Sequence, residues 1–144
     1  MRPADDGRGG GGAPRGGPAL GPEIDDPYAA FLGLRSSGPG VVALRIRPDL
    51  INSAGLLLGP VVFALADYSM GGALWEATGP DEWVATNNVA ISFVASAVEG
   101  VVTCCSTLVQ RGRATGTLAA EVRHEDDRVL ATALGTFSIM RARS

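Results

Sequence analysis

The spacing of hydrophobic side chains divides the chain into a Gly/Pro-rich start and one patterned domain. Residues 1–22 contain almost no large apolar side chain. A segment of this composition cannot bury apolar surface, so it is predicted to be a disordered tail. Residues 23–144 carry apolar side chains at the spacings of helices and strands, and this length suits one domain around one core.

The first patterned segments predict a short helix and a strand. Residues 27–34 begin with a proline and read as an amphipathic helix, with Phe31 and Leu32 facing inward. Residues 36–40, SSGPG, are typical of a turn. Apolar and polar side chains alternate in residues 41–48, which predicts a half-buried strand that ends at its final proline.

The longest apolar segment predicts a buried helix over residues 61–75, VVFALADYSMGGALW. It follows a loop over residues 51–60, and Pro60 suits the first turn of a helix. A helix that is apolar on almost every side is normally buried on most of them. The segment is too short to span a bilayer and is interrupted by Asp67, so no membrane partner is expected.

Four strand-like runs complete the domain. They occupy residues 83–95, 100–110, 115–124 and 128–140. The joints between them are short, which is typical of hairpins and predicts an antiparallel meander. One antiparallel sheet wrapped around one apolar helix, an α+β fold, is the economical packing of these elements.

Composition narrows the possible functions. The chain is 46% hydrophobic and 19% charged, as in a globular protein, and its net charge of −3 without a basic stripe gives no reason to expect nucleic acid. Cys104 and Cys105 are neighbours in a strand and point to opposite faces, so they suit neither a metal site nor a disulfide. His124 has no second histidine at ligand spacing. We expect no metal and a reducing, cytoplasmic location.

Asp67 and Gly59 are the candidates for chemistry. A carboxylate is costly to bury without partners, so Asp67 in an apolar helix suggests a general base or a nucleophile. The alternative is a structural carboxylate or one that faces solvent at the helix edge. Gly59 lies at the helix start, where free N–H groups and the helix dipole favour developing negative charge. Alternatively, Gly59 is a loop glycine that needs a positive φ.

The spacing of these two residues predicts a dimer. Gly59 and Asp67 are eight positions apart, which is about 12 Å along one helix axis. A base and an oxyanion donor must both lie within about 3 Å of one reacting centre. Two antiparallel helices across a two-fold axis could bring Asp67 of one subunit to Gly59 of the other, so at least a homodimer is expected.

The order of these elements and several residues resemble the PaaI-like acyl-CoA thioesterases, which have the hotdog fold. That family has the pattern N-x-x-G-x-x-H-G-G, then six residues, then Asp. Asn52, Gly55, Gly59 and Asp67 fall in register with it, and the resemblance covers residues 27–140. It implies hydrolysis of an acyl-CoA thioester without a metal or organic cofactor. It also implies a site at the interface of a homodimer or homotetramer.

The chain departs from the family pattern at two positions. The family histidine, which lies near the thioester carbonyl, is Leu58 here, and the second glycine is Pro60. Loss of the histidine predicts a lower rate or a changed substrate, or a hotdog protein that binds acyl thioesters without hydrolysing them. A hotdog hydratase or dehydratase normally pairs a histidine with a carboxylate, and the position of His124 in a distal turn argues against that chemistry.

The remaining candidates concern binding. Asn52 is expected to donate to the substrate carbonyl or position the water, or else to form an Asx turn. Thr86 matches the strand after the family's helix and is expected to line the substrate path, although threonine is also simply a good strand residue. Gly112 and Arg113 resemble the family's "GR" turn. Arg111 and Arg113 are expected to meet CoA phosphates, or else to belong to a solvated turn.

Overall fold

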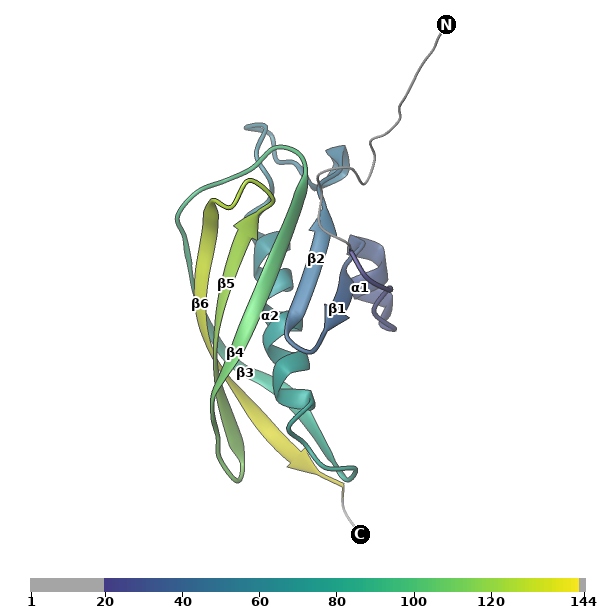
Figure 1. Cartoon of the computed structure of the whole chain (residues 1–144), viewed down its shortest axis with the longest axis vertical. Coiled ribbons are helices and arrows are strands. Elements are labelled where there is room, and N and C mark those ends of the chain that lie inside the picture. Colours follow the sequence, from purple (N-terminus) through teal and green to yellow (C-terminus); the bar gives the residue numbers. More distant parts are fainter. Residues whose placement is uncertain (1–19, 143–144) are drawn as a thin grey trace, which may run out of the picture.

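A curved, six-stranded antiparallel sheet wraps around one long helix (Figure 1). The computed structural model describes residues 20–142. The elements are α1 (Pro27–Leu32), β1 (Arg35–Gly38), β2 (Val41–Arg45), the 3-10 turn η2 (Pro48–Leu50), α2 (Gly59–Trp75), β3 (Glu82–Phe93), β4 (Val101–Arg111), β5 (Thr115–His124) and β6 (Val129–Arg141). The strand order is β1-β2-β4-β5-β6-β3. The α+β arrangement predicted from the sequence is confirmed.

The start of the domain lies close to the end of the predicted tail. Most of that tail, residues 1–19, lies outside the described residues. The carbonyl of Pro22 accepts a hydrogen bond from the Ser36 amide of β1 at 2.9 Å, and Glu23 forms a bridge with Arg35. The packed domain therefore extends at least back to Pro22.

Helix α1 buries a different face from the one predicted. Ala29 and Leu32 are buried, whereas Phe31 is 72% exposed, so the inward orientation expected for Phe31 was wrong. Residues three apart share one side of a helix, and Ala29 and Leu32 occupy the side that meets the sheet. Asp26 caps the helix start, and Gly33 ends it in the left-handed conformation.

Residues 36–40 were expected to be a turn, but most of this segment forms β1. Arg35 pairs with Ala43 and Ser36 with Val42, and the chain reverses only at Pro39 and Gly40. The Ser-Ser-Gly composition hid the strand, because a short edge strand needs few apolar side chains. It also supplies backbone partners for the outer side of β2, which would otherwise be a free sheet edge.

The joint between β3 and β4 is not a hairpin, contrary to the prediction. β3 pairs with β6, and residues 94–100 cross from that end of the sheet to β4. A fully extended chain spans at most about 3.5 Å per residue, so this segment reaches about 24 Å, while three strand spacings of about 4.8 Å need about 14 Å. The joint is short in sequence but long enough for the crossing. The other two joints are hairpins, as predicted.

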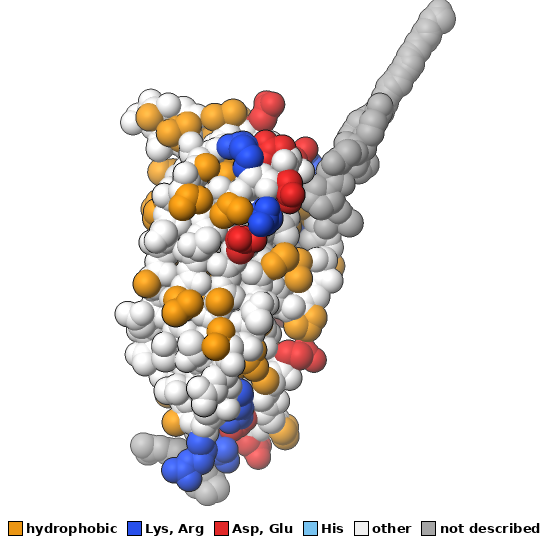
Figure 2. Space-filling view, turned by 60° about the vertical axis from the view of Figure 1, so that its left-hand side comes forward, with side chains coloured by type: hydrophobic (Ala, Val, Ile, Leu, Met, Phe, Trp, Pro, Cys, Tyr) orange, Lys and Arg blue, Asp and Glu red, His pale blue; other side chains and the backbone are white. Residues whose placement is uncertain are grey.

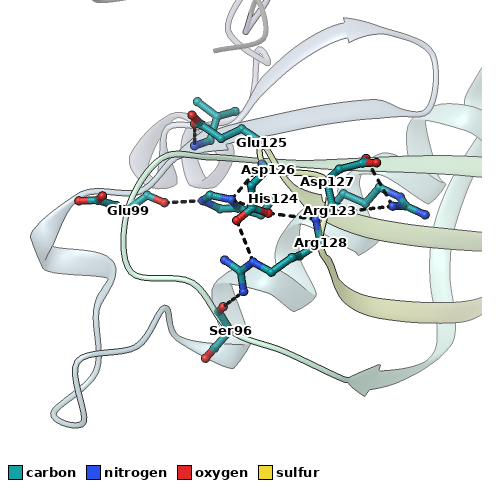
Figure 3. Close-up of polar contacts among 9 residues, drawn as sticks. Ser96, Glu99, Arg123, His124, Glu125, Asp126, Asp127 and Arg128 are labelled. Carbon is teal, nitrogen blue, oxygen red and sulfur yellow. Dashed lines mark hydrogen bonds and ion pairs between the residues drawn. The ribbon is translucent and has the colours of Figure 1, made fainter. Parts of the chain in front are cut away.

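Polar contacts attach the crossing segment to the β5–β6 turn (Figure 3). The Arg128 guanidinium donates to the Ser96 carbonyl at 2.9 Å, and the His124 Nε2 lies 2.7 Å from the Glu99 carbonyl. The His124 Nδ1 lies 3.1 Å from the Asp126 amide. A neutral imidazole protonated at Nε2 satisfies both contacts. Both ring nitrogens of His124 are thus engaged in holding this loop.

This loop gives a pH-dependent prediction. Hydrogen bonds from the Arg128 side chain and amide lower the pKa of Asp126 from 3.8 to about 2. The ionised Asp126 carboxylate therefore contributes its full stabilisation of the fold above about pH 4. This contribution is lost as the pH falls toward 2 and the carboxylate is protonated. We expect Asp126→Asn to lower the melting temperature at pH 7, by a difference that shrinks at pH 3. Equal differences at pH 7 and pH 3 would contradict this origin.

The inner face of α2 forms the centre of the core. Its buried side chains are Val61, Val62, Ala64, Leu65, Ala66, Ser69, Met70 and Leu74. The sheet approaches closely, because β5 and β6 carry glycines opposite the helix. A Cβ on Gly116 would lie 2.6 Å from Leu74, and one on Gly135 would lie 3.0 Å from Met70. These glycines therefore set the distance between helix and sheet.

Ser69 is the one buried polar residue on this face within the described chain. Its hydroxyl lies 2.7 Å from the Gly40 carbonyl and 2.7 Å from the Ser106 hydroxyl. These bonds attach the middle of α2 to β4 and to the β1–β2 turn. No helix within residues 20–142 is both long and apolar enough to cross a membrane.

Candidate active site

One face of α2 remains uncovered between the two edges of the sheet, and it carries two grooves. The first groove, of about 980 Å³, lies between β1 and β3, and its walls include Ile24, Asp25, Ser36, Gly71, Trp75 and Val84. The second groove, of about 620 Å³, runs toward the start of α2, and its walls include Tyr28, Gly59, Phe63, Ala64, Ile91 and Phe93. Asp67 and Tyr68 line both grooves. The grooves thus meet in the middle of the helix.

Asp67 lies at this meeting point and is half-buried. Its Oδ1 accepts a hydrogen bond of 2.7 Å from the Thr86 hydroxyl. Thr86 reaches the carboxylate because it faces inward on the edge strand β3, where it pairs with the inward-facing Phe137. An irregularity at Asn87 then keeps Val89 on the same face. The sequence singled out both residues, and the structure brings them into contact.

The hydrogen bond with Thr86 fixes one carboxylate oxygen and leaves Oδ2 available to a molecule in the groove. A carboxylate held in this way can accept a proton from water or attack an electrophilic carbon. Thr86 lines the first groove and also donates to the Asp67 carboxylate, so it holds the orientation of that side chain.

Gly59 is the first residue of α2 and lies in the second groove. Within residues 20–142 its N–H makes no hydrogen bond, as is usual at a helix start. Pro60 has no N–H, and the Val61 amide donates to the Leu58 carbonyl at 3.1 Å. The Gly59 amide is therefore the free donor at this helix start. It lies two turns from Asp67 on the same face of α2, and its separation of about 12 Å excludes joint action within one chain.

Asn52 lies in the loop before α2 and lines neither groove. Its Oδ1 accepts hydrogen bonds from the amides of Ala54 at 2.9 Å and Leu56 at 3.0 Å. These contacts are those of an Asx turn, the alternative raised from the sequence. The structure does not bring Asn52 to Asp67 or Gly59 of the same chain, and its role toward a substrate stays a prediction.

The arginine candidates lie at the β4–β5 turn, beside the chain that follows the C-terminal end of α2. The Arg111 guanidinium forms an ion pair of 2.6 Å with Glu82 and donates to the Gly112 carbonyl at 2.8 Å. Arg141 pairs with the other Glu82 oxygen at 3.0 Å. Arg113 is exposed. Figure 2 shows that charged side chains gather toward the two ends of the molecule, and few lie between them on the face it presents.

A contact beside Asp67 was missed in the sequence. The Tyr68 hydroxyl donates to Asp26 Oδ1 at 2.8 Å, across 42 positions of the chain. The same carboxylate caps α1 through the amides of Tyr28 and Ala29. Burial, followed by the bond to Asp26, raises the pKa of Tyr68 to about 12, and that bond lowers the pKa of Asp26. From the sequence, only the helix start at Pro27 was predicted.

The cysteines occupy opposite faces, as the sequence indicated. Cys104 is buried and Cys105 is exposed. Burial raises the pKa of the Cys104 thiol to about 11, which keeps it protonated and unreactive. Residues 20–142 contain no group of three or more His, Cys, Asp or Glu side chains placed to hold a metal ion.

Comparison with known proteins assigns this chain to a family. The model of the "Thioesterase superfamily" matches residues 54–131, more than half of the chain. No curated protein matches the chain. A conserved protein of Pseudomonas aeruginosa is 30% identical, with a TM-score of 0.74, and the match covers 82% of this chain and 97% of that protein.

Two solved structures show the same fold at lower identity. A thioesterase of Haemophilus influenzae is 19% identical, with a TM-score of 0.76 over 79% of this chain and 82% of its own. A Bacillus halodurans protein solved with CoA is 19% identical, with a TM-score of 0.77 over 81% of this chain and 78% of its own. With the family match and the helix wrapped by its sheet, this chain belongs to the thioesterase superfamily and has its hotdog fold.

Proposed function

We propose that the protein hydrolyses acyl-CoA or related thioesters to a free acid and a thiol, as in the PaaI-like branch of the superfamily. The observation that carries the proposal is the half-buried carboxylate of Asp67, which Thr86 orients where two grooves meet. A thioester has two arms, the acyl group and the thiol. A carboxylate that lies between two grooves suits a thioester bond whose acyl arm occupies one groove and whose thiol arm occupies the other.

Asp67 acts on the thioester carbonyl in one of two ways. As a general base, it takes a proton from water while the water oxygen bonds to the carbonyl carbon. As a nucleophile, its own oxygen bonds to that carbon, and water later hydrolyses the anhydride. In both, the carbon–sulfur bond breaks, the thiolate takes up a proton, and one water is consumed per thioester. The chemistry needs no redox partner.

The developing oxyanion is stabilised by the Gly59 amide of a second subunit. A free N–H at a helix start, aligned with the helix dipole, suits an oxygen that gains negative charge. Since Gly59 and Asp67 of one chain are about 12 Å apart, the donor comes from an antiparallel α2 across a two-fold axis. The exposed apolar side chains of the second groove, Phe63 and Phe93, support burial against a partner.

Arg113 is the better candidate for contact with CoA phosphates. It is exposed, whereas Arg111 is engaged by Glu82 and by the Gly112 carbonyl. Gly112 and Arg111 therefore shape the turn that presents Arg113. The Bacillus halodurans relative solved with CoA supports a CoA thioester as the substrate class.

The second candidate function is binding of acyl thioesters without hydrolysis. It is favoured by Leu58, which packs partly buried against the core and places no polar side chain beside Gly59. A protein of this kind would use the same grooves and the same dimer. The two functions differ only in turnover.

A turnover panel separates the two functions. We expect the purified protein to release free CoA from at least one class of acyl-CoA, among short-chain, long-chain and aromatic thioesters, measured by reaction of the new thiol with a chromogenic reagent. The control is the same assay with the matching S-alkyl thioether, which cannot be hydrolysed. Tight binding of acyl-CoA with no thiol release across the panel would select the non-catalytic function.

A further inference from the structure

Two neighbouring side chains of α2 lie where the two grooves adjoin. Within the described residues, only Asp67 and Tyr68 line both grooves. Asp67 is the proposed reacting group, so Tyr68 is the remaining shared wall. Its ring stands beside the carboxylate at the point where the volumes of about 980 Å³ and 620 Å³ adjoin.

The boundary falls at the same place on the opposite wall. Asp26 lines the first groove, and Tyr28, two residues later, lines the second. The Tyr68 hydroxyl reaches across to Asp26 with its 2.8 Å hydrogen bond. The Tyr68 side chain and its bond to Asp26 therefore form a partition that runs from α2 to the start of α1. One end of this partition is fixed by the backbone of α2 and the other by the Asp26 carboxylate.

This carboxylate is itself held in place. Asp26 Oδ1 accepts from the Tyr28 amide at 3.0 Å and from the Ala29 amide at 3.4 Å, so its position is set by the first turn of α1. Because the pKa of Tyr68 is raised to about 12, the phenol stays protonated and donates at neutral pH. The ring consequently has little freedom to swing into either groove.

The grooves differ in the groups they suit. Apart from Asp67, the second groove is lined by uncharged, mostly apolar side chains, including Phe63, Ile91 and Phe93. The first groove also carries Asp25 and Glu76, together with serine hydroxyls. The acyl group suits the second groove, and the amide-containing thiol arm suits the first.

We infer that Tyr68 is a specificity-determining residue, whose ring, held by Asp26, closes the acyl groove and limits the length of the acyl group. The inference rests on the proposed thioester hydrolysis. Without the ring, the second groove would open into the first, and a longer acyl chain would find space beside Asp67.

The test compares acyl-CoA substrates of increasing straight-chain length. Tyr68→Leu removes the partition, Tyr68→Phe removes only its hydroxyl, and Asp26→Ser keeps a helix cap but is too short to reach Tyr68. Asp49→Ser is the matched control, since Asp49 is exposed and lines neither groove. The readout is the ratio of kcat/KM between a long and a short substrate, which does not depend on the folded fraction.

We expect Tyr68→Leu to raise this long-to-short ratio by about tenfold or more, as expected when a pocket gains room for extra methylenes. Tyr68→Phe and Asp26→Ser should shift it in the same direction by less, and Asp49→Ser should not shift it. An unchanged ratio in Tyr68→Leu, with the wild type active, would overturn the inference and leave the proposed function intact. If the wild type hydrolyses no thioester, the proposed function fails, and binding of S-alkyl-CoA thioethers tests Tyr68 by the same ratio.

Discussion

Asp67→Asn is expected to lower kcat by about 10²-fold or more, in the range found when a general base is removed. Asparagine keeps the shape of the side chain and can still accept the Thr86 hydrogen bond, but it can neither take a proton from water nor attack a carbonyl. Substrate affinity should change little. Stability should hold or rise, because a partly buried charge is removed while its hydrogen bond is kept.

The experiment measures turnover and thermal unfolding on one preparation. Asp49→Asn is the matched control, because Asp49 is an exposed carboxylate outside both grooves and should keep wild-type turnover. A structural Asp67 would give the opposite pattern, with lower stability and normal turnover per folded molecule. A well-folded Asp67→Asn protein with the wild-type rate would refute the proposed mechanism, though not the fold.

Loss of the Gly59 amide is expected to lower kcat by about 10² to 10³-fold, the range for one oxyanion donor. The double variant Gly59→Pro with Pro60→Ala moves the proline by one position, and among backbone donors it differs from Pro60→Ala alone by the loss of the Gly59 N–H. No helical hydrogen bond is lost, and Leu58 already has the extended backbone that precedes a proline. The comparison is with Pro60→Ala alone. Equal rates in the two variants would exclude the Gly59 amide as the donor.

Mixing the two inactive proteins tests whether the site is shared between subunits. A heterodimer of Asp67→Asn with the Gly59 variant contains one site with both groups intact, if Asp67 and Gly59 come from different chains. Random exchange of subunits would then restore up to about a quarter of wild-type sites. A mixture that stays inactive after verified subunit exchange would place both groups of a site in one chain.

The parts of the fold that follow from local pattern could be predicted. β5 runs over Thr115–His124, as its alternating side chains indicated, and the apolar run gave α2 within two residues of its start. β1 and the partner of β3 could not be predicted in this way. Which strands pair is decided by contacts between distant segments, and the sequence of residues 94–100 is equally compatible with a hairpin and a crossing.

For the candidate site as well, single residues could be predicted from the sequence, but the contacts between them could not. Asp67 stood out because a charge in an apolar helix is conspicuous, and Thr86 stood out by its place on the next strand. Their contact depends on the register of β3 against β6, which no local pattern specifies. The bond between Tyr68 and Asp26 was invisible for the same reason, since a tyrosine in an apolar helix is unremarkable until its distant partner is known.

The pairing of β3 with β6 has a consequence for biosynthesis. β3 is made before β4 and β5, but its only partner within the described residues is the last strand of the sheet. At about 5–20 residues per second, β3 waits roughly two to seven seconds on the ribosome for β6. During that time its backbone groups and apolar side chains are unprotected. A nascent chain arrested before residue 129 should therefore be sensitive to proteases and bind chaperones, whereas one arrested after β6 has left the exit tunnel should resist digestion.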